Sequence, residues 1–368
     1  MRIMITGGGT GGHTSPAVAI IEELQRRDPR LAVQWVGRKG GIEERICERI
    51  AVPFRSVPVE GWPRRQSLRR LWVAAKLALG VARSLLYLKR FRPQLVIGVG
   101  GYVSLPLCFA AQRLGVPTIL HEQNKRLGMA NQLLATRAAR ILLSYPDTIG
   151  DYARENARVV GNPVRAEFRS PPERQAACEQ LGLAPEIPVV LVSGGSQGAH
   201  SLNAAMAAAL PQFGAQEVQF LWMTGQADAP QAREVAQRAA AHVEVFAFID
   251  DMATACAAAD LIIGRAGASS AAEIAVLGKP SILVPYPHAT DNHQEQNARA
   301  FQDAGAAILL PDAECTGDRL AHIIRELLAD SDRLEAMAAA AASLARPGAA
   351  GAIVEEILVQ AFGQTDAA

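Results

Sequence analysis

Residues 3–13, Ile3-Met4-Ile5-Thr6-Gly7-Gly8-Gly9-Thr10-Gly11-Gly12-His13, join a short apolar run to a glycine-rich turn. A second segment has the same form, Val190-Leu191-Val192-Ser193-Gly194-Gly195-Ser196-Gln197-Gly198. Each is followed by a run of helix-forming residues. A strand that passes through glycines into a helix opens a doubly wound α/β domain. The sequence therefore predicts two such domains.

Short β-branched runs alternate with longer helical runs through both halves of the chain. The apolar runs are nearly continuous, as expected for parallel strands that helices cover on both faces. Right-handed crossovers would connect these strands. The predicted strands are residues 2–6, 32–36, 95–99, 117–121, 140–144, 158–160, 189–193, 218–223, 243–246, 261–264, 281–284 and 307–310.

The length of 368 residues also favours more than one domain. The segment Gly161-Asn162-Pro163-Val164-Arg165 lies between the two halves, and we place the hinge near residue 162. We expect an N-terminal domain at 1–162, a C-terminal domain at 163–345, and a last helix within 346–368 that could stay on the second domain or cross back. In two doubly wound domains that face each other, the carboxyl ends of both sheets border the cleft where ligands bind.

Charge and cysteine content exclude several classes of protein. Lys and Arg (37) nearly balance Asp and Glu (36), so no overall basic field recruits nucleic acid. The five cysteines are scattered and form no CxxC pair, so no disulfide framework or zinc site is predicted. A reducing cytoplasm is the expected compartment.

The first glycine turn also matches the dinucleotide fingerprint, Gly7-x-Gly9-x-x-Gly12. A NAD site needs an acidic residue at the end of the next strand, but that strand runs into Arg38 and Lys39. Arg38 suits a 2′-phosphate, so NADP binding remains an alternative. Neither glycine turn is followed by Gly-Lys-Ser/Thr, which excludes a Walker loop. Both turns could instead hold the anionic parts of one substrate pair, or simply form tight strand–helix turns.

His13 ends the first glycine turn at the expected start of a helix. The positive end of the helix dipole favours the neutral imidazole, which can accept a proton. We therefore predict that His13 acts as a general base. A structural cap is the alternative interpretation.

Taken in order, eight motifs resemble the MurG family of bacterial N-acetylglucosaminyltransferases. They are 8–13 (Gly-Gly-Thr-Gly-Gly-His), 98–102 (Gly-Val-Gly-Gly-Tyr), 121–124 (His-Glu-Gln-Asn), 161–165 (Gly-Asn-Pro-Val-Arg), 194–198 (Gly-Gly-Ser-Gln-Gly), 248–252 (Phe-Ile-Asp-Asp-Met), 265–268 (Arg-Ala-Gly-Ala) with Glu273, and 291–294 (Asp-Asn-His-Gln). The resemblance spans roughly residues 2–310. It implies a GT-B fold, with the acceptor bound by the N-terminal domain and UDP-GlcNAc mainly by the C-terminal one.

The resemblance further implies transfer of GlcNAc to the C4 hydroxyl of the MurNAc-pentapeptide of lipid I, with inversion at the anomeric carbon and formation of lipid II. No cofactor or metal is implied. His13 matches the proposed base, and Tyr102 and Glu122 are candidates for the acceptor side. Donor-contacting positions are matched by Thr10, Gly11, Gly12, Asn124, Arg165, Ser196, Ile249, Glu273 and Gln294. His293 stands where some members have a second glutamine, so only Gln294 is carried over.

The departing diphosphate needs positive potential. The backbone N–H groups of the diphosphate loop (Ser196, Gln197 and Gly198) and the cation of Arg165 could supply it. Asp250 and Asp251 are the nearest candidates for metal ligands. They are better explained as a helix N-cap followed by an acid in the first turn.

A local excess of positive charge lies between Glu60 and Arg92, where nine Lys or Arg residues face one acid. Four of the cations recur every seven residues (Arg69, Lys76, Arg83 and Arg90) and would line one side of a helix. Together with the apolar residues Leu68, Trp72 and Leu79, and with the lipid-linked acceptor that the resemblance implies, this stripe predicts a patch that binds anionic lipids of the inner leaflet. The chain would then be peripheral on the cytoplasmic face of the bacterial inner membrane.

A crossover helix with solvated cations is the alternative explanation of the same segment. Gly80 and Ser84 suggest a bend or two helices there. The uncharged stretch 93–112 is the one with the length of a membrane span, but its glycines and Pro106 favour a strand, a turn and a helix.

Three other functions are compatible with the sequence. A UDP-sugar 2-epimerase would share the two-domain architecture, but needs acidic groups near the sugar and no lipid surface. An NADP-dependent oxidoreductase would fit the first glycine turn. A non-enzymatic module that binds nucleotide sugars would release no UDP in the presence of acceptor.

Overall fold

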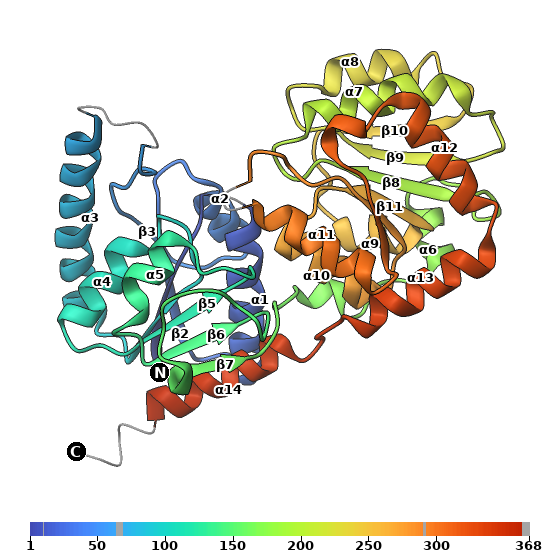
Figure 1. The fold of residues 1–368 in the computed structure, drawn as a ribbon. Helices are drawn as coiled ribbons and strands as arrows, with labels where there is room; N and C mark the ends of the chain where they lie inside the picture. The colour runs from blue at the N-terminus through green and yellow to red at the C-terminus, as the bar shows by residue number, and fades with distance from the viewer. Residues whose placement is uncertain (10, 64–68, 290–291, 363–368) are drawn as a thin grey trace. The chain divides into compact units, whose positions relative to one another are not determined.

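The computed structural model describes residues 1–9, 11–63, 69–289 and 292–362. The chain divides into two compact units, one formed by residues 1–166 together with the segment from Arg346 onward, and one formed by Glu167–Ala345. Each unit contains one parallel β-sheet with helices packed against it (Figure 1).

The sheet of the first unit has seven parallel strands in the order β3-β2-β1-β4-β5-β6-β7. The direction of winding reverses between β1 and β4, which are neighbours, and ligands of doubly wound sheets bind at such a point. The strands are β1 Arg2–Thr6, β2 Ala32–Gly37, β3 Phe54–Ser56, β4 Leu95–Gly98, β5 Thr118–Glu122, β6 Arg140–Leu143 and β7 Ala157–Val159.

The two faces of this sheet are covered by different helices. Ile3 and Ile5 of β1 pack in one cluster with residues of α1, α2 and α14, whereas Met4 joins a cluster on the other face with residues of α3, α4 and α5. This alternation is the period-two pattern of a strand buried on both sides. The helices are α1 Gly11–Arg27, α2 Ile42–Arg49, α3 Arg69–Phe91, α4 Leu105–Arg113, α5 Met129–Ala135 and α14 Ala349–Phe362, with a 3₁₀ turn at Arg154–Asn156.

The last helix, α14, packs against α1 and is part of the first unit. Ile353, Val354 and Ile357 are fully buried in the cluster that contains Ile3. Glu356 accepts a hydrogen bond from Arg158 and forms ion pairs with Arg158 and Arg140, which connect the helix to β7 and β6. The sequence left the position of this helix open.

The sheet of the second unit has six parallel strands in the order β10-β9-β8-β11-β12-β13. They are β8 Val189–Ser193, β9 Gln219–Met223, β10 His242–Phe246, β11 Leu261–Gly264, β12 Ser281–Leu283 and β13 Ala307–Leu309. The helices are α6 Arg174–Gln180, α7 His200–Ala209, α8 Ala229–Ala236, α9 Met252–Ala258, α10 Ala268–Leu277, α11 His293–Asp303, α12 Gly317–Leu328 and α13 Ser331–Ser343. Short 3₁₀ turns occupy Ala166–Phe168, Leu210–Gln212 and Asp312–Glu314.

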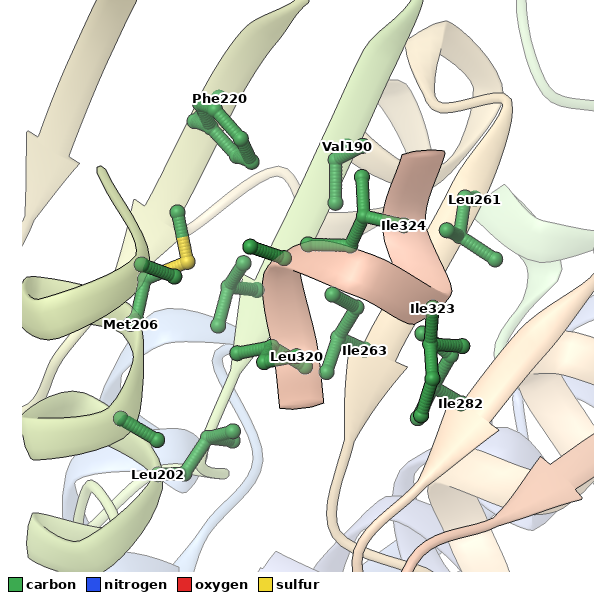
Figure 2. Packing of buried hydrophobic residues seen from close by; sticks show 14 of the residues in the cluster. Val190, Leu202, Met206, Phe220, Leu261, Ile263, Ile282, Leu320, Ile323 and Ile324 are labelled. Carbon is green, nitrogen blue, oxygen red and sulfur yellow. The ribbon is translucent and has the colours of Figure 1, made fainter. Parts of the chain in front are cut away.

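A core of large aliphatic side chains holds α7 and α12 against this second sheet. Figure 2 shows Val190, Ile263 and Ile282 of the sheet beside Leu320 and Ile324 of α12. All five side chains are fully buried. Burying an aliphatic side chain of this size contributes about 1.5–3 kcal/mol, so this core stabilises the packing of α12 on the sheet.

Twelve predicted strands are confirmed within one residue at each end, and the stretch 93–112 forms β4, a turn and α4 as expected. The strand β3 was missed. The prediction of a bend near Gly80 was wrong, because α3 is a single helix from Arg69 to Phe91 (Figure 1). A Cβ at Gly80 would lie 2.7 Å from the carbonyl oxygen of Pro58, so this glycine allows close packing.

Among the described residues, α3 is the helix that is long and apolar enough to cross a membrane by length and composition, since an 18-residue window of it has a mean hydropathy of 1.5. The sequence had pointed to 93–112 as the one stretch of that length, and this was wrong. Leu71, Trp72, Leu79 and Leu86 of α3 are exposed, and few of its side chains are buried.

Candidate active site

The first glycine turn joins the carboxyl end of β1 to α1, next to the point where the sheet changes direction. Gly11 and Gly12 are the first residues of α1, and His13 follows, half-buried. Thr10 lies outside the described residues. This part of the predicted donor-binding set is therefore placed at the edge of the sheet where doubly wound folds bind ligands.

The imidazole of His13 lies against the backbone of the turn that follows β4. A Cβ on Gly100 would lie 3.1 Å from Nδ1 of His13, and a Cβ on Gly101 would lie 3.1 Å from its Cδ2. Both glycines have positive φ, +89° and +75°. Tyr102 comes next, half-buried, and a Cβ on Gly9 would lie 3.1 Å from its ring. Two glycine-rich motifs far apart in the sequence thus form one surface around His13 and Tyr102.

A chain of hydrogen bonds leads from His13 into the interior of the first unit. Its Nδ1 lies 3.0 Å from Oε1 of Gln123, and Nε2 of Gln123 lies 2.8 Å from Nδ1 of His121. Nε2 of His121 lies 3.1 Å from the carbonyl oxygen of Gly161. Nε2 of Gln123 also donates to the carbonyl oxygen of Val99 at 3.0 Å. His121 and Gln123 are 0% and 2% exposed, so water cannot compete with these bonds.

Burial lowers the pKa of His121 to about 4, although its bond to Gly161 favours the charged form. Below pH 6.5 the unfolded chain protonates this residue, and the folded chain does so only near pH 4. We therefore expect the first unit to lose up to about 3 kcal/mol of stability from this group as the pH falls from 6.5 to 4.

The difference in stability between the wild type and His121→Gln isolates this group. Hydrogen exchange of core amides in β1 and β4 reports the free energy of opening of the first unit. The difference between the two proteins should shrink between pH 6.5 and 4. A difference that stays constant over that range would contradict a buried neutral His121.

Glu122 holds the loop that carries Asn124. Its carboxylate is 2% exposed and accepts hydrogen bonds from the backbone N–H and side-chain amide of Asn124, both at 3.1 Å. It also accepts from the N–H of Gly128 and the amide of Asn131, each at 2.9 Å. Four donors use the capacity of one carboxylate, so Glu122 orients Asn124 and offers no open group to an acceptor.

The second glycine turn, residues 194–199, joins β8 to α7 in the same way. Gly195 and Gly198 have φ of +83° and +77°, and the N–H of Gly198 donates to the carbonyl of Gly195 at 2.9 Å. Ser196 is half-buried and Gln197 is exposed. The turn thus projects Ser196 and Gln197 at the carboxyl end of a central strand, where a diphosphate can be bound by N–H groups.

The other candidates of the second unit follow further strands of its sheet. Ile249, 7% exposed, comes after β10, and its N–H points to the sulfur of Met223 at 3.4 Å. Glu273 is half-buried on α10, after β11. Gln294 is half-buried near the start of α11, after β12, and its Oε1 accepts from the N–H of Tyr286 at 2.9 Å. Within the second unit these residues and Ser196 all follow the carboxyl ends of strands.

Two charged groups near these residues have structural roles. Asp251 caps α9, because its carboxylate accepts from the N–H and hydroxyl of Thr254 at 3.0 and 2.7 Å. The cap is therefore Asp251, one residue after the position expected from the sequence. Arg265 forms an ion pair with Asp312 at 2.5 Å. Arg165, half-buried, lies in the segment that ends the first unit.

Sequence reasoning missed two buried side chains that shape the first site, Gln123 and Glu43. Glu43 is fully buried and accepts hydrogen bonds from the N–H groups of Gly9 and Arg38, at 3.3 and 2.8 Å. It therefore stabilises the conformation of the first glycine turn. Gln123 lies within a quoted motif, but its partners are 24 and 110 residues away. Nothing local in the sequence signals such contacts.

Within the part of the chain that the structure describes, no group of three or more His, Cys, Asp or Glu could hold a metal ion.

The family models of glycosyltransferase family 28 match both halves of the chain, the N-terminal domain at residues 3–143 and the C-terminal domain at 189–353. A protein of Moorella thermoacetica is 42% identical over 97% of this chain and 98% of its own length. One of Listeria welshimeri is 37% identical over 97% and 99%. Both are UDP-N-acetylglucosamine--N-acetylmuramyl-(pentapeptide) pyrophosphoryl-undecaprenol N-acetylglucosamine transferases. The crystal structure of Acinetobacter baumannii MurG is 31% identical, with a TM-score of 0.76, over 97% of this chain and 99% of that one.

The chain belongs to the MurG family. The expected fold, GT-B with two Rossmann-like parallel-sheet domains, is confirmed, and so is the expectation that the chain is a glycosyltransferase. A UDP-GlcNAc 2-epimerase of Neisseria meningitidis has a TM-score of 0.67 at 14% identity. This likeness shows the shared fold alone.

Proposed function

We propose that this member of the MurG family transfers GlcNAc from UDP-GlcNAc to the C4 hydroxyl of the MurNAc-pentapeptide of lipid I, giving lipid II for peptidoglycan synthesis. Donor and acceptor are the substrates named for its curated relatives. No cofactor takes part in the proposed reaction.

The second unit would bind the donor. N–H groups of Ser196–Gly198 at the end of β8 meet the diphosphate, and Arg165 adds a positive charge. Glu273 accepts hydrogen bonds from the ribose hydroxyls, and the backbone at Ile249 recognises the uracil. Gln294 contacts the GlcNAc, because an amide can both donate to and accept from sugar hydroxyls. Gly11, Gly12 and Asn124 complete the donor contacts from the first unit.

The first unit would bind the acceptor and supply the base. His13 removes the proton of the C4 hydroxyl as the oxygen forms a bond to the anomeric carbon. The bond from that carbon to the diphosphate oxygen breaks on the opposite face, and UDP leaves with the bonding electrons. One displacement of this kind inverts the anomeric centre and gives a β(1→4) linkage. Proton removal by a positioned histidine contributes ~10²–10⁴-fold in rate.

The observation that carries this proposal is the position of His13, held by Gln123 and by two glycine turns at the carboxyl end of β1 and β4. The test is incubation with a lipid I analogue and either UDP-GlcNAc or UDP-GalNAc. With UDP-GlcNAc as donor, the mass of the product should show one added HexNAc. One equivalent of UDP should be released. No product from either donor would contradict the proposal. UDP without a glycosylated acceptor would indicate hydrolysis instead.

We further propose that the chain binds the inner leaflet as a peripheral protein, on the cytoplasmic face, through the exposed face of α3. Leu71 and Leu86 are 71% and 66% exposed on this face, near Trp72 and Leu79. Arg83, Lys89 and Arg90 are exposed on the same helix. Leu68 of the predicted patch lies outside the described residues. An apolar face flanked by cations binds an anionic bilayer interface.

A cavity of about 610 Å³ beside this helix is strongly basic. It is lined by five cations, Arg38, Lys39, Arg69, Lys76 and Arg83, and by one carboxylate, Glu60. Glu60 accepts from Lys76 at 2.6 Å and from Nε of Arg69 at 3.0 Å, and these bonds lower its pKa to about 2. Two cations are thus compensated by Glu60, and the cavity retains an excess of positive charge that suits a phosphate-bearing headgroup.

Arg83→Glu is expected to weaken binding to vesicles rich in anionic phospholipid by roughly 30-fold, because it changes the charge by two and each charge near the surface contributes about 1 kcal/mol. Leu71→Gln with Leu86→Gln should also weaken binding. Leu133→Gln on α5, where the leucine is similarly exposed, serves as the matched control. Vesicle flotation at low and high salt measures the effect. If vesicle binding were unchanged by high salt and by Arg83→Glu, the electrostatic part of the proposal would be contradicted.

A further inference from the structure

The buried chain from Gly161 to His13 determines where His13 carries its proton. A backbone carbonyl oxygen can only accept a hydrogen bond, so Nε2 of His121 must donate to Gly161 across their 3.1 Å contact. A neutral imidazole has one N–H, which leaves Nδ1 of His121 with a lone pair. His121 is fully buried, and burial disfavours its charged form. Its Nδ1 is therefore an acceptor.

That acceptor fixes the orientation of the Gln123 side chain. The amide NH₂ of Gln123 has two hydrogens, and it faces two acceptors, Nδ1 of His121 at 2.8 Å and the carbonyl oxygen of Val99 at 3.0 Å. Rotating the amide by 180° would place its oxygen against two acceptors and lose both bonds. Each buried bond lost in this way costs about 1–3 kcal/mol. The amide oxygen must therefore point toward His13.

The amide oxygen of Gln123 determines the roles of the two ring nitrogens of His13. Oε1 of Gln123 can only accept, and it lies 3.0 Å from Nδ1 of His13. Nδ1 of His13 therefore carries the proton in the neutral ring, and Nε2 carries the lone pair. Nε2 is the atom that a general base needs free.

We propose that Gln123 is a positioning residue that, with His121 behind it, locks His13 in the tautomer whose Nε2 can accept the proton of the attacking hydroxyl. The proposal rests on the proposed function in that it assigns the base role to His13. After proton transfer, Oε1 of Gln123 still accepts from Nδ1, so the ring keeps its orientation while it carries a positive charge. Neither Gln123 nor His121 touches the reacting atoms in this account.

The tautomer can be measured without turnover. In protein labelled with ¹⁵N-histidine, a ring nitrogen with a lone pair resonates far downfield of one that bears hydrogen. The chain has seven histidines, and the His13 signals are those missing from His13→Ala. We expect a bare Nε2 and a protonated Nδ1 for His13 in the wild type, and a mixture of tautomers in Gln123→Leu and His121→Phe.

Activity should follow the tautomer. Gln123→Leu and His121→Phe should lower kcat by at least about 10-fold, within the ~10²–10⁴-fold that a general base supplies, with the KM for UDP-GlcNAc little changed. Gln112→Leu is the matched control, since Gln112 also donates to two acceptors in the first unit, Thr118 and the carbonyl of Leu134. It should leave both kcat and the His13 signals unchanged. Unshifted signals of the five histidines other than His13 and His121 show that a variant is folded.

Two results would overturn the proposal: a protonated Nε2 in neutral His13 of the wild type, or wild-type kcat and an unchanged tautomer in Gln123→Leu. Wild-type kcat in His13→Ala would instead remove the base role from the proposed function. The ¹⁵N measurement would still decide the tautomer in that case, so the two failures are distinguishable.

Discussion

Replacing His13 with alanine is expected to lower kcat by ~10²–10⁴-fold, which corresponds to about 3–5 kcal/mol of transition-state stabilisation. The variant loses the imidazole that we propose accepts the proton of the C4 hydroxyl. The affinity for UDP-GlcNAc should change little, because the proposed site for the diphosphate is the other glycine turn, residues 194–199. Initial rates with saturating lipid I analogue measure kcat, and calorimetric titration measures donor binding.

His322→Ala is the control for the loss of an imidazole. His322 is an exposed residue of α12 and pairs with Glu326 on the surface, so its removal should leave kcat unchanged. A near-normal kcat in His13→Ala would show that another group, or water, accepts the proton. Equal losses in kcat and in donor affinity would show that His13 helps to bind the nucleotide sugar instead.

Gly198→Ala is expected to disable the second glycine turn. Its φ is +77°, and a Cβ would lie 2.2 Å from the carbonyl oxygen of Thr224, which is backbone and cannot rotate away. Strain and displacement of the turn together should cost about 3–5 kcal/mol in the stability of the second unit. Loss of two charge-assisted bonds to the diphosphate should weaken UDP binding by roughly 100-fold.

Gly195→Ala separates the clash from the backbone conformation. Gly195 also has positive φ, +83°, but a Cβ there would meet nothing within 4 Å. Gly195→Ala should lower the stability of the second unit by about 1–2 kcal/mol, the cost of placing alanine in the left-handed conformation. Thermal unfolding and UDP titration of both variants measure the difference. Equal effects of the two substitutions would contradict the close contact between Gly198 and Thr224.

The strands and the two glycine turns could be predicted from the sequence because their signal is local. Runs such as Val189–Ser193 are apolar throughout and end at glycines, so both the strand and its carboxyl end are visible. The strand β3 escaped because its three residues, Phe54, Arg55 and Ser56, include one apolar side chain and so form no apolar run. Gly80 was misread because its role is a contact with Pro58, which no helical pattern records.

The residues that hold the first glycine turn and His13 in place could not be predicted, because their partners lie far away in the sequence. Glu43 looks like an ordinary acid in the first turn of a helix, yet it is fully buried beneath the first glycine turn. Gln123 and His121 belong to the motif at residues 121–124. Their proposed role, however, depends on the directions of hydrogen bonds among residues of four separate segments. Such directions follow only from the folded geometry.

We propose that an acceptor hydroxyl, deprotonated by His13, displaces UDP from the sugar in one step. The anomeric configuration of the disaccharide formed by the wild-type protein tests it most directly, through the proton–proton coupling at the new glycosidic carbon. One displacement predicts the β anomer from the α-linked donor. A product with the α configuration would contradict the account.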